Sequence, residues 1–179
     1  MMMDGPNRDA WQNPELVIEE LISSPDLTVA DLGAGTGYFT SLFSRELSEG
    51  KVLSLEPEPA LVDWLAKRKE EEGLHNVSIH LIKHSDPGID SLDDHIDLLF
   101  IGYTYFHIDN PVGYFSHKVH PFIDEKTSVV IADAAPEFPA ARRKVPEAQV
   151  ISEMEEAGFR LKSAPPILDR QYLLTFKKA

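Results

Sequence analysis

The sequence contains no cysteine among its 179 residues. Disulfide bonds, thiolate metal ligands and a cysteine nucleophile are therefore excluded, and we expect no metal site. No apolar run approaches the roughly 20 residues that a membrane-spanning helix needs. Residues 1–6 have neither the basic region nor the apolar stretch of a secretory signal, so we expect a cytoplasmic protein.

Basic residues are also scarce, because 17 Lys and Arg face 30 Asp and Glu and leave a formal net charge of −13. Such an acidic surface repels the phosphate backbone of nucleic acids. The densest basic cluster, Arg142-Arg143-Lys144, is short enough to be a solvated loop. The charge balance therefore disfavours nucleic acid as a partner.

Short apolar runs alternate with amphipathic helical patterns along the chain. The predicted strands are 26–32, 51–55, 76–82, 96–101, 127–132, 159–163 and 171–177, and the predicted helices are 13–22, 36–47, 59–72, 110–122 and 146–157. This alternation predicts an α/β fold with a mostly parallel seven-stranded sheet and helices on both faces.

The connection between the last two predicted strands is short and contains Pro165-Pro166. A parallel pair needs a longer crossover, usually a helix, so the last strand is predicted to be antiparallel. The chain length fits one domain. We expect an N-terminal segment and helix at 1–25, followed by a single domain at 26–179.

A glycine-rich loop, Asp31-Leu32-Gly33-Ala34-Gly35-Thr36-Gly37, follows the first predicted strand and leads into a helix. Glycines permit a sharp turn and a close approach of backbone to ligand, and ligands of open α/β sheets bind at the carboxyl ends of strands. A dinucleotide fingerprint that starts at Gly33 would need glycine at position 38, where this chain has Tyr38. The third glycine falls instead at Gly37.

The pattern Asp-x-Gly-x-Gly-x-Gly at 31–37 resembles motif I of the class I S-adenosylmethionine-dependent methyltransferases. Segments 8–14, 96–107 and 151–159 resemble parts of the small, quinone-biosynthesis-related type. The glycine turn usual before the fifth strand is missing, and Pro121-Phe122-Ile123-Asp124-Glu125-Lys126 stands there. The resemblance implies a Rossmann-like fold, S-adenosylmethionine as cofactor, and methyl transfer to a small-molecule acceptor.

The resemblance also implies a set of cofactor-binding residues. These are Asp31, Gly33, Ala34, Gly35, Gly37, Glu56 and Asp86. Glu56 ends the second predicted strand, where a carboxylate can accept hydrogen bonds from both ribose hydroxyls. In the family, the residue at the place of Asp86 contacts the adenine, although Asp-Pro-Gly is also an ordinary turn signal.

Candidates for the chemistry follow the fourth and fifth predicted strands. His107 is the candidate general base, because the unperturbed pKa of histidine lies near working pH, although it could also simply pack beside Ile108. Tyr103 and Tyr105 are predicted to be pocket walls whose aromatic faces approach a sulfonium cation. Asp133 either orients an acceptor hydroxyl or caps a loop.

Two other functions stay open. One is a non-catalytic cofactor- or partner-binding domain on a methyltransferase scaffold, because the chain lacks the extra helices that usually build an acceptor pocket and lid. The other is an NAD-dependent oxidoreductase, which Glu56 would suit and Tyr38 disfavours. Arg8 and Trp11 are candidates for a flap over the cofactor, and for Trp11 packing against the first helix is the alternative.

Overall fold

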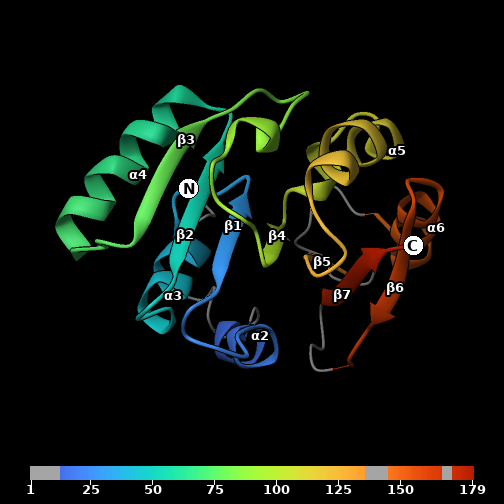
Figure 1. Ribbon diagram of the computed structural model, residues 1–179, viewed down its shortest axis with the longest axis horizontal. Coiled ribbons are helices and arrows are strands. Elements are labelled where there is room, and N and C mark those ends of the chain that lie inside the picture. Colours follow the sequence, from blue (N-terminus) through green and yellow to red (C-terminus); the bar gives the residue numbers. More distant parts are fainter. Residues whose placement is uncertain (1–12, 136–144, 167–170) are drawn as a thin grey trace.

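The structure, a computed structural model, describes residues 13–135, 145–166 and 171–179. Seven strands form one sheet in the order β3-β2-β1-β4-β5-β7-β6, which spans the molecule in Figure 1. The strands are β1 (Thr28–Leu32), β2 (Lys51–Glu56), β3 (Val77–Leu81), β4 (Leu98–Gly102), β5 (Ser128–Ala134), β6 (Phe159–Ser163) and β7 (Gln171–Lys178).

Strand direction matches the sequence-based expectation. β1 pairs in parallel with β2 and β4, and the outer pairs β2–β3 and β4–β5 are parallel too. β7 runs antiparallel to both of its neighbours, β5 and β6. The mostly parallel seven-stranded sheet with an antiparallel last strand is therefore confirmed. The insertion of β7 between β5 and β6 was not predicted.

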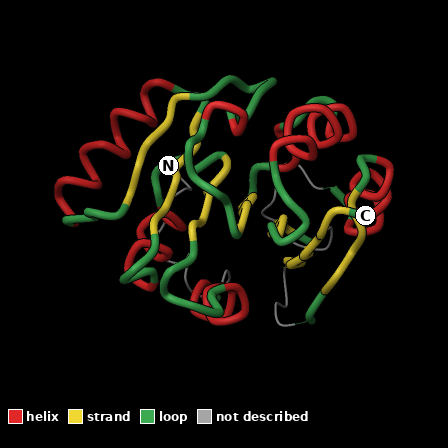
Figure 2. Tube along the Cα trace, in the orientation of Figure 1, coloured by secondary structure: helices red, strands yellow, loops and turns green. Residues whose placement is uncertain are grey.

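Helices cover both faces of this sheet (Figure 2). They are α2 (Pro14–Leu21), α3 (Tyr38–Glu46), α4 (Pro59–Glu72), α5 (Pro111–Tyr114) and α6 (Glu147–Glu156). Arg68 of α4 donates to the carbonyl of Thr36 just before α3, and Arg45 of α3 pairs with Glu72 of α4. These contacts hold α4 beside α3.

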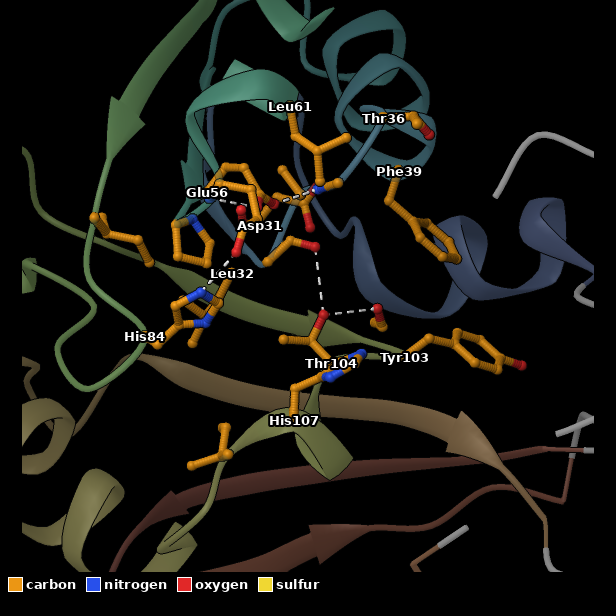
Figure 3. A pocket seen from close by; sticks show the side chains of 18 of the residues that line it. Asp31, Leu32, Thr36, Phe39, Glu56, Leu61, His84, Tyr103, Thr104 and His107 are labelled. Carbon is orange, nitrogen blue, oxygen red and sulfur yellow. Dashed lines mark hydrogen bonds and ion pairs between the residues drawn. The ribbon is translucent and has the colours of Figure 1, made fainter. Parts of the chain in front are cut away.

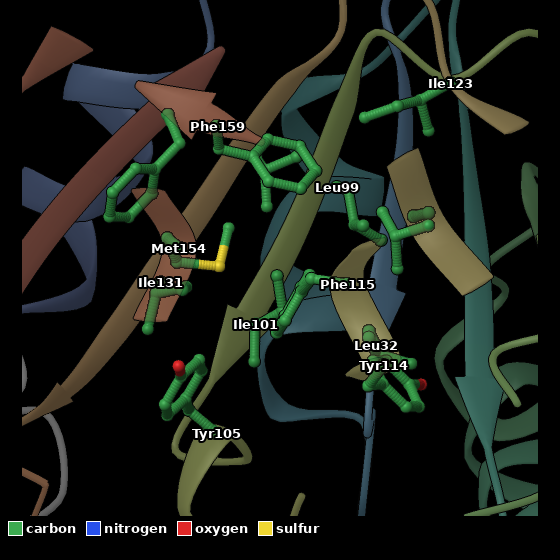
Figure 4. Close-up of a cluster of buried hydrophobic side chains, with 14 of the residues drawn as sticks. Leu32, Leu99, Ile101, Tyr105, Tyr114, Phe115, Ile123, Ile131, Met154 and Phe159 are labelled. Carbon is green, nitrogen blue, oxygen red and sulfur yellow. The ribbon is translucent and has the colours of Figure 1, made fainter. Parts of the chain in front are cut away.

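Strand β4 is buried on both faces, which explains why its sequence is apolar without interruption. Successive side chains of a strand point to opposite faces, so a strand that is covered on both faces needs apolar residues throughout. Leu98 and Phe100 join the core cluster with α2 and α3, whereas Leu99 and Ile101 join the cluster with α5 and α6. Figure 4 shows this second cluster.

The region predicted as one helix at 110–122 consists of three short helical pieces. α5 is followed by a π-helical turn at Phe115–Val119 and a 3-10 turn at His120–Phe122. The backbone N–H of Gly113 donates to the side chain of Asn110, which caps α5. Pro121 has no backbone N–H to continue a regular helix.

Several expectations fall outside the described residues. These are the candidate flap residues Arg8 and Trp11, the basic cluster Arg142-Arg143-Lys144, and most of the loop that contains it. Within the described ranges, no helix is both long and apolar enough to cross a bilayer.

Candidate active site

A cavity of about 350 Å³ opens at the carboxyl edge of the sheet (Figure 3). Its walls come from the loops that follow β1, β2, β3 and β4, together with Tyr114 of α5. The carboxyl ends of parallel strands meet at one edge, and ligands of open α/β sheets bind there. The fold therefore brings the glycine loop to the position expected for a ligand site.

The three glycines of the loop are needed for different reasons. Gly33, Gly35 and Gly37 all have positive φ, at 76°, 59° and 83°, where other L-residues are strained. A Cβ on Gly33 would lie 2.4 Å from the side chain of Thr104, and one on Gly37 would lie 2.6 Å from Leu65. Gly33 and Gly35 line the cavity with Ala34, whereas Gly37 packs against α4.

Glu56 is the buried acceptor of the site, with 3% of its surface exposed. Its Oε2 accepts from the backbone N–H of Gly35 at 2.7 Å, and its Oε1 accepts from the N–H of Glu58 at 3.0 Å. A carboxylate offers about four lone-pair sites, so it can accept further hydrogen bonds beside these two. The arrangement suits a ligand with two adjacent hydroxyl groups, such as the ribose of S-adenosylmethionine.

Asp31 lies at the end of β1, lines the cavity, and is buried. Its Oδ2 accepts from the hydroxyl of Thr40 at 2.7 Å, and that hydroxyl also lies 2.9 Å from Ser54 Oγ. Asp31 therefore ties β1 to α3 and β2 beneath the glycine loop.

A sharp bend after β4 forms the opposite wall. Tyr103 has a φ of 55°, its N–H donates to Ala132, and its phenol donates to the side chain of Gln171. The Thr104 hydroxyl lies 3.3 Å from the carbonyl of Gly33, which joins this bend to the glycine loop. In Figure 3, Tyr103 extends to one side, while Thr104 and His107 face the loop. His107 is exposed and lines the cavity.

Tyr105, predicted to be a pocket wall, is buried in the core and does not line the cavity. It is 1% exposed, is not among the lining residues, and donates its hydroxyl to Glu153 of α6 at 2.7 Å. Burial, with help from Glu153, raises the pKa of Tyr105 above its ordinary value. The structure therefore places this candidate in the core and outside the lining of the cavity.

Asp86 is not among the residues that line the cavity, although Lys83 and His84 of the same loop are. Its Oδ2 accepts from Lys118 at 2.8 Å, and its Oδ1 accepts from the N–H of Gly88 at 3.1 Å. The hydrogen bond from Lys118 lowers the pKa of the Asp86 carboxyl. Each carboxylate oxygen of Asp86 therefore has one protein donor, and Asp86 links its loop to the turn that contains Lys118.

Sequence reasoning missed several lining residues, among them Lys83, His84, Thr104 and Tyr114. Thr104 meets Gly33 only because β1 and β4 pair, and this strand order was not predicted. His84 Nε2 lies 2.8 Å from Glu58 Oε1, so this hydrogen bond links the loop after β3 to the loop after β2.

In the described ranges, no group of three or more His, Cys, Asp or Glu side chains is arranged to hold a metal ion.

Asp133, at the end of β5, is fully buried but does not line the cavity. Its Oδ1 accepts from the N–H of Ala134 at 2.7 Å, whereas its Oδ2 has no hydrogen-bond partner. Burial raises the pKa of Asp133 to about 7.

A family model described as a methyltransferase domain matches residues 29–117. That segment contains every residue that lines the cavity, from Asp31 to Tyr114. The chain carries a class I S-adenosylmethionine-dependent methyltransferase domain. This confirms the predicted enzyme class and its cofactor, S-adenosylmethionine, whereas the quinone-biosynthesis subtype stays a prediction.

Solved structures agree with this methyltransferase fold. A S-adenosylmethionine-dependent methyltransferase from Aquifex aeolicus aligns with a TM-score of 0.83 at 19% identity, over 99% of this chain and 96% of that one. A glycopeptide N-methyltransferase complexed with S-adenosylmethionine aligns with a TM-score of 0.76 at 15% identity, over 93% and 86% of the two chains.

An O-methyltransferase from neocarzinostatin biosynthesis, in complex with S-adenosylhomocysteine and 1,4-dihydroxy-2-naphthoic acid, aligns with a TM-score of 0.71 at 14% identity. The alignment covers 85% of this chain and 49% of that one. At such identities the likeness establishes the fold. No curated protein sequence matches the chain.

Proposed function

We propose that this methyltransferase domain acts on a small-molecule acceptor. The observation that carries the proposal is the cavity at the carboxyl edge, where buried Glu56 and the glycine loop lie opposite the exposed imidazole of His107. The net charge of −13 argues against a nucleic-acid substrate. The aligned enzyme whose complex holds 1,4-dihydroxy-2-naphthoic acid supports the same acceptor class.

In this proposal the cofactor lies along the glycine loop. Gly33, Ala34 and Gly35 let the backbone approach it, and Glu56 accepts hydrogen bonds from its ribose hydroxyls. Asp31 and Gly37 hold the loop in shape through their contacts with Thr40 and Leu65. When bound, the cofactor would supply an electrophilic methyl group on a sulfonium, and its sulfur would be the leaving group as a neutral thioether.

The chain's own residues then position the acceptor and receive its proton. An imidazole nitrogen of His107 takes the proton as the bond between acceptor and methyl group forms and the sulfur–methyl bond breaks. Tyr103 and Thr104 form the wall that orients the acceptor, since alignment of the reacting atoms is the main contribution of the protein. Tyr105 supports this wall from the core through its bond to Glu153.

We also propose that residues 26–179 form a single domain against which the N-terminal helix packs. Val17 and Ile18 of α2 are buried in the cluster that contains Phe43 of α3 and Phe100 of β4. This contact makes α2 part of the same hydrophobic core.

Two variants separate the two halves of the site and serve as controls for each other. Glu56→Gln should weaken binding of S-adenosylhomocysteine about 10- to 100-fold by calorimetry, because hydrogen bonds to a charged carboxylate are lost. His107→Ala should keep that affinity but lose most turnover, measured by mass spectrometry of S-adenosylhomocysteine formed with a panel of phenols, hydroxynaphthoates and amines.

Unchanged affinity in Glu56→Gln would contradict the ribose role. Binding without turnover on any acceptor in the panel, in the parent protein, would favour a non-catalytic cofactor-binding domain. The exposed variant Glu46→Gln in α3 should change neither quantity.

A further inference from the structure

The loop at 82–88, which follows β3, forms one end of the cavity. Ile82, Lys83 and His84 line it, as does Tyr114 of α5. The resemblance to class I methyltransferases implies that the ribose lies at Glu56 on β2 and that the adenine lies at the residues after β3, the next strand outward. The 82–88 loop is therefore the purine end of the cofactor site.

The loop is closed on itself around Asp86. The backbone N–H of Lys83 donates to the carbonyl of Asp86 at 3.1 Å, and the N–H of Asp86 donates to the carbonyl of Lys83 at 3.0 Å. Gly88, at φ 65°, donates its N–H to Asp86 Oδ1 at 3.1 Å. Asp86 thus sets the path of the two residues, Lys83 and His84, that reach the cavity.

The same carboxylate ties the loop to the π-helical turn. Lys118 Nζ lies 2.8 Å from Asp86 Oδ2. Each partner shifts the pKa of the other in the direction of the charged pair, lowering that of Asp86 and raising that of Lys118. Burial raises the pKa of the Tyr114 phenol, and the negative charge of Asp86 adds to this rise.

A side-chain hydrogen bond between His84 and Glu58 forms a second attachment of the loop. His84 Nε2 lies 2.8 Å from Oε1 of Glu58, and the backbone N–H of Glu58 donates to Glu56. The loop is therefore fastened both to the start of α4, beside Glu56, and to the turn that follows Tyr114.

We propose that the Asp86–Lys118 ion pair positions the 82–88 loop and Tyr114 around the purine of the cofactor, and that Asp86 does not itself contact the base. Asp86 and Lys118 are positioning residues that act through Lys83, His84 and Tyr114. The inference rests on the proposed cofactor site.

The expected effect is modest, because the two side chains are 31% and 45% exposed. Exposed ion pairs contribute little stability on their own. We therefore expect Asp86→Asn and Lys118→Met each to weaken S-adenosylhomocysteine binding about two- to fivefold by calorimetry. The double variant should bind about as well as either single variant, because both changes remove the same interaction.

Three further measurements make this test specific. Lys118→Arg keeps the charge and should retain parental affinity. The ratio of affinities for S-adenosylhomocysteine and S-inosylhomocysteine, which lacks the exocyclic amine, should stay constant in all variants. Lys51, at the start of β2, forms an exposed ion pair with Asp94 and does not line the cavity. Lys51→Met breaks this ion pair and should leave binding unchanged.

The proposal is overturned if Lys118→Met binds as well as the parent, whether or not Asp86→Asn folds. It is also overturned if Asp86→Asn loses more than tenfold in affinity together with the preference for adenine over hypoxanthine, since Asp86 would then contact the amine. Absence of S-adenosylhomocysteine binding by the parent would refute the proposed cofactor site instead.

Discussion

At the scale of single residues, neighbouring glycines of one motif meet different physical demands. Gly33 allows the bend after β4 to approach, because any Cβ there would overlap the Thr104 side chain. Gly37 begins α3 in a left-handed conformation and leaves space for Leu65 of α4. The position of the third glycine at 37, which indicated the cofactor class, thus also determines how two helices pack.

Asp133 provides a pH-dependent prediction at this scale. Burial raises the pKa of Asp133 to about 7, whereas an aspartate in an unfolded chain ionises near pH 4. Between these pH values the folded state holds one more proton than the unfolded state, so the free energy of unfolding falls as the pH rises. Asp133→Asn keeps an acceptor for the Ala134 N–H and removes this titration.

The Asp133→Asn variant should therefore gain stability over the parent at about pH 8, by up to about 4 kcal/mol, and gain little at about pH 4. Urea unfolding at both pH values measures the difference. Identical pH dependence in the two proteins would show that Asp133 is ionised when folded.

Site residues were predictable from sequence where a motif fixes the backbone. Gly33, Ala34, Gly35 and Glu56 were expected at the ends of β1 and β2, and these residues line the cavity. Asp86 was predicted to contact the adenine, and it is not among the residues that line the cavity; an Asp-Pro-Gly turn does not reveal which way its carboxylate points. Its partner Lys118 is 32 residues away, and no local pattern links the two.

At the scale of elements, the two walls of the cavity depend on irregular backbone. The positive φ of Tyr103 turns the chain sharply after β4 and brings Thr104 over Gly33. On the other side, Phe115 and Val119 of the π-helical turn are buried in the core, while Tyr114, just before this turn, lines the cavity. The residues at 110–122 follow a helical pattern, so sequence periodicity predicted the helix but not the tertiary packing that interrupts it.

The Tyr105→Phe variant tests whether the hydrogen bond from Tyr105 to Glu153 stabilises the bend after β4. Tyr105→Phe should lower the free energy of unfolding by about 1–2 kcal/mol, because the hydroxyl that donates to Glu153 is lost from a buried site. Affinity for S-adenosylhomocysteine and turnover should stay near parental values. Chemical denaturation and calorimetry measure the two effects, and a variant with normal stability but no turnover would restore the catalytic role of this tyrosine.

At the scale of the whole molecule, one sheet carries the site at its carboxyl edge and two core clusters on its faces. The strands, the helices and the antiparallel last strand followed from hydrophobic periodicity and connection length. The strand order did not, because it depends on which faces pack and on where each crossover returns.

Ligand-linked stability distinguishes the cofactor classes for the intact protein. A ligand at 100 times its Kd stabilises the folded state by about 2.7 kcal/mol, which for a chain of this size corresponds to roughly 5–10 °C in Tm. S-adenosylhomocysteine should produce this shift in scanning calorimetry, and NAD should produce none. A shift with NAD alone would favour the oxidoreductase.

The position of β7 has a consequence for the order of folding. Among the strands of the described residues, β6 pairs only with β7, and β7 in turn pairs with β5, which lies about 40 residues earlier in the chain. Strand β6 cannot join the sheet until this long-range pairing is made, although it precedes β7 in the sequence. Amide protons of β6 should therefore exchange with solvent no more slowly than those of β7, and the β6 edge should be the first part of the sheet to open.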